Sequence, residues 1–154
     1  MKYLKTGILC LLTFSICAFV SAQKVITQNQ PATLKPQLFK EIPNRLPVVA
    51  SKLSPLLTLR KGQPASISLS DKFIFRGTVV SSVSKYNDAI QSTVIKSTDY
   101  PGATLTISRI KNSDGSVAYR GRIISFQHGD CFELKNENGQ YILIKRNFED
   151  MVND

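Results

Sequence analysis

The chain has 154 residues, 42% of them hydrophobic, and its 20 Lys and Arg outnumber 11 Asp and Glu to give a formal net charge of +9. This length allows one domain with a substantial core, and the sequence contains no internal repeat and no low-complexity tract. The excess of positive charge favours anionic neighbours, such as lipid headgroups, acidic polysaccharide, cell-wall polymer or an acidic protein surface.

The first 22 residues show the three zones of an export signal. Lys2 and Lys5 make the first zone positive, residues 7–20 are almost entirely apolar, and Val20-Ser21-Ala22 fits a signal-peptidase site. The apolar run is shorter than the roughly 20 residues that a transmembrane helix needs. We therefore expect a secreted or periplasmic product with no transmembrane segment and no nucleic-acid partner. An uncleaved membrane anchor is the alternative.

Removal of residues 1–22 takes away Lys2 and Lys5, so the formal charge falls from +9 to +7, and it leaves Cys131 as the one cysteine. A single cysteine cannot form an internal disulfide, so stability must come from packing. We expect Cys131 to be a buried, structural side chain, and a reactive thiol is the alternative.

We expect three segments along the chain: a signal peptide over 1–22, a flexible lead-in over 23–34 and a single β-rich domain over 35–154. Four prolines interrupt residues 35–62, and proline is tolerated in the first turn of a helix but not in its interior. Ser54-Pro55 fits a helix N-cap and its first residue. We therefore expect one or two short helices here, packed as a lid on a sheet.

The remainder alternates apolar and polar residues between turn signals, which is typical of half-buried strands. We expect strands at 65–70, 72–83, 90–97, 103–111, 117–127, 130–135 and 140–146. Asp114-Gly115, His128-Gly129 and Asn138-Gly139 mark tight turns between the last four. The predicted fold class is mainly β, an antiparallel β-meander that forms a curled sheet or a small barrel, with a final helical turn from Phe148.

If these three turns are two-residue loops, the register assigns the core face and the opposite face. The core face then holds Tyr119, Ile123, Phe132, Leu134, Tyr141 and Leu143. The opposite face is half apolar, with Leu105 and Ile107 among its members, and half cationic. Its basic residues are Arg109, Arg120, Arg122, Lys135 and Arg146, with Glu133 as the one carboxylate among them.

The same register places Arg109 opposite Arg120 and Arg122 opposite Lys135. Like charges in direct cross-strand positions are unfavourable unless water screens them, a carboxylate bridges them or an anion lies between them. These five basic residues are our candidate binding site. An ordinary solvated face is the alternative.

His128, Asp130 and Cys131 lie close together in the sequence, but catalytic groups usually come from distant positions. We expect His128 to lie in a turn and to point into solvent. One histidine and one cysteine cannot build a usual zinc site, and the sequence has no calcium loop, phosphate loop, dinucleotide fingerprint or nucleophile elbow. We therefore expect no metal, no cofactor and no catalytic residue that the sequence identifies.

The sequence favours an exported, non-enzymatic binding module for an acidic protein or an anionic polymer of the cell envelope, acting as an inhibitor or an accessory subunit. Two alternatives stay open. One is a small hydrolase whose carboxylates the sequence does not pair. The other is a barrel that carries a small apolar ligand. The sequence does not predict the oligomeric state.

Overall fold

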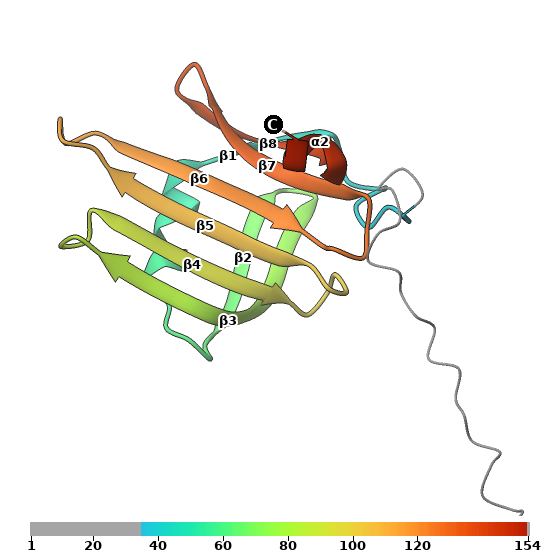
Figure 1. Ribbon diagram of the computed structural model, residues 1–154, viewed down its shortest axis with the longest axis horizontal. Helices are drawn as coiled ribbons and strands as arrows, with labels where there is room; N and C mark the ends of the chain where they lie inside the picture. Colours follow the sequence, from blue (N-terminus) through green and yellow to red (C-terminus); the bar gives the residue numbers. More distant parts are fainter. Residues whose placement is uncertain (1–34, 154) are drawn as a thin grey trace, which may run out of the picture.

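The computed structural model describes residues 35–153, so the expected signal peptide and lead-in lie outside the described residues. Eight antiparallel strands form one curled, half-barrel sheet in the order β1-β8-β7-β6-β5-β4-β3-β2 (Figure 1). The strands are β1 (Arg45–Val48), β2 (Pro64–Ser70), β3 (Phe73–Lys85), β4 (Ile90–Ser97), β5 (Thr104–Lys111), β6 (Val117–Ile124), β7 (Asp130–Glu137) and β8 (Gln140–Asn147). Strands β2 to β7 each pair with the next strand in the chain, so the predicted antiparallel meander is confirmed.

Strand β1 was not expected, because prolines surround it in the sequence. It pairs with β8 alone, with Leu46 opposite Leu143 and Pro47 opposite Ile142. Proline cannot donate a ladder hydrogen bond and is therefore confined to edge strands, which is where Pro47 lies. Leu46 and Val48 alternate with exposed residues and are buried in the core.

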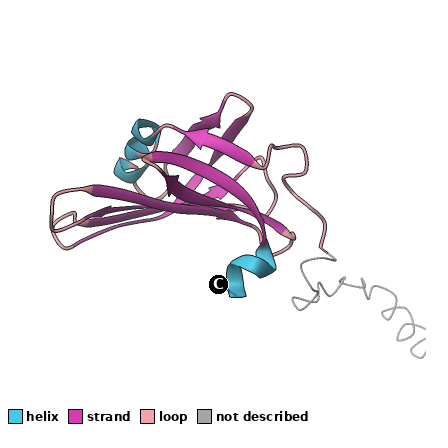
Figure 2. Cartoon of the chain, turned by 90° about the horizontal axis from the view of Figure 1, so that it is seen from above, coloured by secondary structure: helices cyan, strands magenta, loops and turns pink. Residues whose placement is uncertain are grey.

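The expected short helices are two 3-10 helices, η2 (Ala50–Lys52) and η3 (Ser54–Thr58). Pro55 lies in the first turn of η3, and the buried Leu56 and Leu57 pack this helix over β4 and β5. A C-terminal helix, α2 (Phe148–Asn153), follows β8 directly. Figure 2 shows α2 well apart from the η2–η3 segment.

Aromatic and aliphatic side chains fill the interior of the curled sheet. The ring of Phe39 lies 5.2 Å from that of Phe132 and 6.1 Å from that of Phe73, measured between centroids. Five of the six predicted core residues are buried, and Tyr119 is half-buried and packs against them. The predicted core face is thus confirmed.

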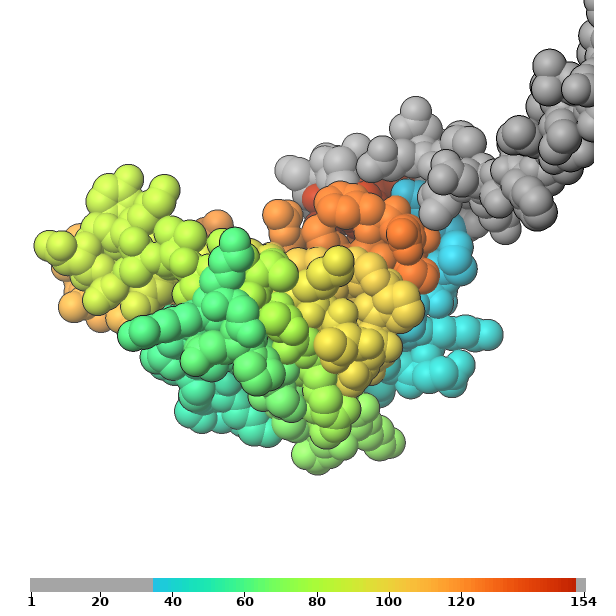
Figure 3. Space-filling model, turned by 90° about the horizontal axis from the view of Figure 1, so that it is seen from below, coloured from blue at the N-terminus to red at the C-terminus, as the bar shows by residue number. Residues whose placement is uncertain are grey.

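The β3–β4 hairpin extends beyond this core. Residues 82–88 are all exposed, and they project from the body of the molecule (Figure 3). A bulge at Val80, between the pairs made by Val79 and Ser81, shifts the β3–β4 register. Such an extra residue increases the local twist and bends the strand.

Only one of the three expected two-residue loops is present. Asn138 and Gly139 both have positive φ, 52° and 86°, and Glu137 pairs with Gln140 across them. Such values fit the type I′ turn that Asn-Gly favours. The other two turns are longer, so two of the predicted registers are wrong.

The β5–β6 loop contains three residues between Asn112 and Ser116, whose backbone N–H and C=O are hydrogen-bonded at 2.9 Å. Gly115, with a φ of 82°, takes the left-handed position that ends such a loop. The register therefore differs by one residue from the expected one, and Arg109 lies opposite Tyr119 rather than Arg120. Because side chains alternate between faces, this shift turns Arg109 to the inner face. Leu105 and Ile107 turn with it and are buried in the core.

The β6–β7 connection spans residues 125–129, and it differs from the expected loop by two residues in register. Arg122 consequently lies opposite Glu133 rather than Lys135, but both strands keep the expected faces. The longer connection is held by the N-terminal segment, since the Gly129 N–H donates to the Pro36 carbonyl at 3.1 Å. A shift of two residues preserves faces, which is why the predicted core face survives.

Candidate anion-binding site

Strands β6 and β7 separate after a short stretch of pairing. They pair over three residues, from Ile123 with Phe132 to Gly121 with Leu134, whereas β6 pairs with β5 over eight and β7 with β8 over eight. Figure 1 shows the β7–β8 hairpin diverging from β6 toward the start of β6. We call this gap the β6–β7 split.

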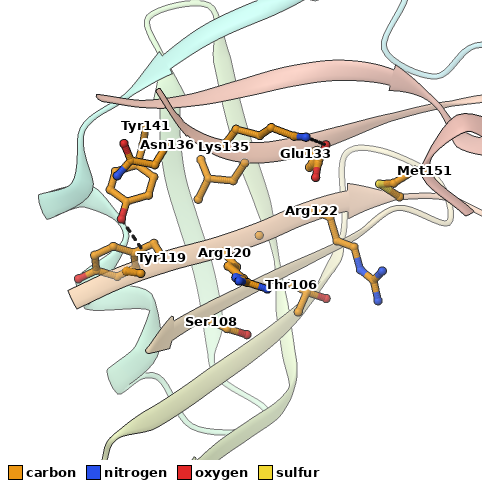
Figure 4. Close-up of a pocket in the computed structure, with 13 residues that line it drawn as sticks. Thr106, Ser108, Tyr119, Arg120, Arg122, Glu133, Lys135, Asn136, Tyr141 and Met151 are labelled. Atoms are coloured by element: carbon orange, nitrogen blue, oxygen red, sulfur yellow. Dashed lines mark hydrogen bonds and ion pairs between the residues drawn. The ribbon is translucent and has the colours of Figure 1, made fainter. Parts of the chain in front are cut away.

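A groove of about 690 Å³ lies at the split. Its walls come from β6 and β7, with β5 and α2 contributing at its sides (Figure 4). The side chains that define its chemistry are Thr106, Ser108, Arg120, Arg122, Glu133, Lys135, Asn136 and Met151, with Tyr119 and Tyr141 between the strands.

The two tyrosines close the inner side of the split. The Tyr119 N–H donates to the Tyr141 hydroxyl oxygen at 2.9 Å, and the two rings meet edge to face with centroids 5.6 Å apart. This hydrogen bond replaces one that β7 would accept if the ladder continued. The sequence predicted both tyrosines as core residues but gave no sign of this role.

Glu133 is bound to two of the predicted site residues. Its carboxylate lies 3.2 Å from the Lys135 Nζ and 3.5 Å from the Arg146 Nε. Lys135 lines the groove, whereas Arg146 is linked to it only through Glu133. Glu133 therefore bridges Lys135 and Arg146, which is not one of the two like-charged pairs that the sequence predicted. A single carboxylate neutralises these two cations only in part.

Arg120 and Arg122 differ from Lys135 and Arg146 in their ion pairing. Both are exposed, and among residues 35–151 neither side chain has an ion-pair partner. Arg122 lies opposite Glu133 in the ladder, but its guanidinium is directed away from that carboxylate in Figure 4. Their direct neighbours on β5 are Ser108 and Thr106. The Thr106 hydroxyl is a further donor at the groove, whereas the Ser108 hydroxyl donates to the Ser92 Oγ at 2.9 Å. The sequence did not predict these two hydroxyls at the site, because the expected register of β5 against β6 was wrong by one residue and placed them on the other face.

Arg109 does not belong to this group, so its predicted position is wrong. On the inner face its Nη1 donates to the Gln91 Oε1 at 3.1 Å, and its buried Nε has no partner among the described residues. The structure thus brings Arg120, Arg122 and Lys135 together, attaches Arg146 through Glu133, and separates Arg109 from them. Whether these residues bind an anion stays a prediction.

His128, Asp130 and Cys131 each make contacts with other parts of the chain. Both Asp130 oxygens accept backbone N–H groups, from Leu38 at 2.6 Å and Phe39 at 2.7 Å. His128 does not point freely into solvent as expected, because its half-buried ring has Nδ1 2.8 Å from the Ser125 Oγ. A Ser–His contact is the core of many hydrolase sites, but Ser125 is fully buried and offers no access to a substrate.

Two structural features are absent from the described part of the chain. Within it, no three His, Cys, Asp or Glu side chains are grouped so that they could hold a metal ion. Residues 35–153 also include no helix with the length and apolar character needed to span a bilayer.

Comparisons of the chain with protein-family models, with curated proteins and with solved structures found no match in any of the three. The groove itself is therefore the feature from which a function can be inferred.

Proposed function

We propose that this protein is an exported, non-enzymatic binding module that holds an acidic protein segment or an anionic polymer in the β6–β7 groove. One observation carries the proposal. Arg120 and Arg122 stand on the same side of one strand beside a groove of about 690 Å³, and no carboxylate of the described residues pairs with them. Guanidinium groups bind carboxylate, sulfate and phosphate with two parallel hydrogen bonds.

The charge balance of the groove supports an anionic ligand. Arg120, Arg122 and Lys135 line it, while Glu133 is the one carboxylate that the described residues contribute and is already shared with Arg146. A ligand with several negative charges offsets this excess better than isolated small ions, because neighbouring contacts are made without a further loss of translational freedom.

The same residues argue against a hydrolase at this groove. Glycoside hydrolysis uses two carboxylates that flank the scissile bond. Within the described part of the chain, the groove offers only Glu133, which is engaged in two ion pairs. Binding without catalysis is the function that fits this set of side chains.

Export forms part of the proposal and rests on the three zones of residues 1–22. We expect intact-mass analysis of the protein from the envelope or the medium to show a chain that starts at Gln23. A species that retains Met1 to Ala22 would contradict this, and it would favour the uncleaved anchor.

Charge reversal at Arg120 and Arg122 tests whether the groove binds anions. We expect Arg120→Glu/Arg122→Glu to elute from a sulfated polysaccharide column at clearly lower salt than the unchanged protein, because two guanidinium contacts become repulsive. The matched control is Arg60→Glu/Lys61→Glu. It changes net charge equally at two exposed positions between η3 and β2.

Both double variants must show the circular dichroism spectrum and melting temperature of a folded protein for the comparison to count. If they elute at the same salt, retention reflects overall charge and the solvated-face alternative holds.

A further inference from the structure

We propose that the occupant of the groove is an extended acidic peptide segment that binds as an added β-strand along the free edge of β6. This inference rests on the proposed function and specifies the chemistry of the partner. Its evidence is that an edge of β6 without a partner strand lies beside the groove that Arg120, Arg122 and Lys135 line.

The hydrogen-bonding direction of each β6 residue follows from two contacts. The Asn112 N–H donates to the Ser116 carbonyl, so the even-numbered residues that continue this ladder bond to β5. Residues of odd number therefore direct their N–H and C=O away from β5. Tyr119 confirms this, because its N–H points into the split and donates to the Tyr141 hydroxyl.

Val117 and Tyr119 thus present backbone groups to the split, where β7 no longer pairs with them. At about 3.4 Å per residue, the stretch from Val117 to Arg120 provides an edge for roughly four residues of a partner strand. An exposed strand edge of this kind is a template for pairing with another chain, as in β-strand addition by peptide-binding domains.

The charges beside this edge select the partner. An added strand places every second side chain on the outer face, next to Arg120 and across from Lys135. Opposite charges in cross-strand positions stabilise pairing, so acidic residues at alternate positions fit. A polysaccharide or a lipid headgroup offers the charge but lacks the regular amide groups that would continue the ladder.

Tyr141 marks where the first backbone contact would form. Its hydroxyl oxygen occupies the position at the Tyr119 N–H that a carbonyl of a partner strand takes in a continuous ladder. A bound peptide would supply that carbonyl and release the Tyr141 hydroxyl toward the groove.

The first experiment compares two probes on two variants. The probes are a ten-residue peptide of alternating Thr and Glu, and dextran sulfate, which carries charge without an amide backbone. Val117→Pro removes one N–H on the free edge and leaves the β5 ladder intact, while Val117→Ala is the control that keeps this N–H. We expect Val117→Pro to weaken peptide binding about fivefold or more, Val117→Ala to leave it nearly unchanged, and both to bind dextran sulfate as before.

The results with these probes and variants distinguish anion binding in the groove from strand addition along β6. If Arg120→Glu/Arg122→Glu fails to weaken either probe relative to Arg60→Glu/Lys61→Glu, the proposed function itself is overturned. If that variant weakens both probes but Val117→Pro binds the peptide as Val117→Ala does, anion binding stands and strand addition is overturned. Self-association in sedimentation velocity without peptide, lost in Val117→Pro, would assign the edge to a second copy of the chain.

A second measurement does not depend on how Val117→Pro folds. In the unchanged protein, we expect the peptide to slow amide hydrogen exchange at Val117 at least tenfold, because its N–H becomes hydrogen-bonded to the added strand. An unchanged exchange rate at saturating peptide would overturn strand addition.

Discussion

At the scale of single residues, burial sets the chemistry of Cys131. Its side chain is fully buried, with the sulfur 3.5 Å from the Arg146 carbonyl oxygen and 3.9 Å from the Met151 sulfur. Burial raises the pKa of the thiol from 9.0 to about 11, and the negative charges of Asp130 and Glu133 act in the same direction. A raised pKa means less thiolate at any pH below it, and the thiolate is the reactive form.

We therefore expect the native protein to react with a thiol reagent at pH 8 at least about a hundredfold more slowly than the denatured protein, where the pKa returns to its ordinary value. Absorbance at timed intervals measures both rates. A native rate close to the denatured one would show that the thiol is accessible and would restore the reactive-thiol interpretation.

At the scale of elements, two charged side chains fasten the N-terminal segment to the sheet. Asp130, at the start of β7, accepts the N–H groups of Leu38 and Phe39, and Lys145 on β8 donates to the carbonyls of Phe39 and Ile42. These contacts place the Phe39 ring against the rings of both Phe73 and Phe132. The segment thus contributes to the core without belonging to a strand.

We expect Asp130→Ala to lower the free energy of unfolding by about 1–3 kcal/mol, because it leaves two backbone N–H groups without their acceptor. Limited proteolysis should then cut near residues 36–42 earlier than in the unchanged protein.

Asp114→Ala is the matched control for this change. Asp114 also accepts a backbone N–H, from Ser116 at 2.8 Å, but in an exposed turn where water can replace it. Equal loss of stability in the two variants, measured by urea unfolding, would show that burial of the Asp130 contacts does not matter.

At the scale of the whole molecule, Phe132 joins parts that are distant in the sequence. Its ring lies 5.7 Å from that of Phe73 on β3 and 5.2 Å from that of Phe39, so it connects β7 across the interior of the half-barrel. A single core built this way should unfold cooperatively.

We expect Phe132→Ala to cost about 3–5 kcal/mol, the usual range for truncation of a buried aromatic ring. Phe126→Ala is the control, because Phe126 is 62% exposed and should contribute much less. Chemical denaturation measures both, and an unchanged midpoint for Phe132→Ala would contradict the central position of this ring.

The sequence by itself determined the strand-rich fold class, most strand positions and the core face of β6 to β8. These depend on local causes: period-two alternation, the Asn138-Gly139 turn and the exclusion of proline from helix interiors. The candidate residues Arg120, Arg122 and Lys135 were also found this way, since a two-residue error in the β6–β7 register leaves the faces unchanged.

Only the tertiary structure decided the position of Arg109, the pairing of β1 with β8 and the split between β6 and β7. Asp114-Gly115 fits a two-residue or a three-residue loop, and the difference of one residue turns every β5 side chain to the other face. The β1 pairing and the Asp130 contacts join residues about 90 or more positions apart, so no local pattern encodes them. The split exists because the β7–β8 hairpin curls away while Tyr141 satisfies the Tyr119 N–H, a balance that is set by three-dimensional packing.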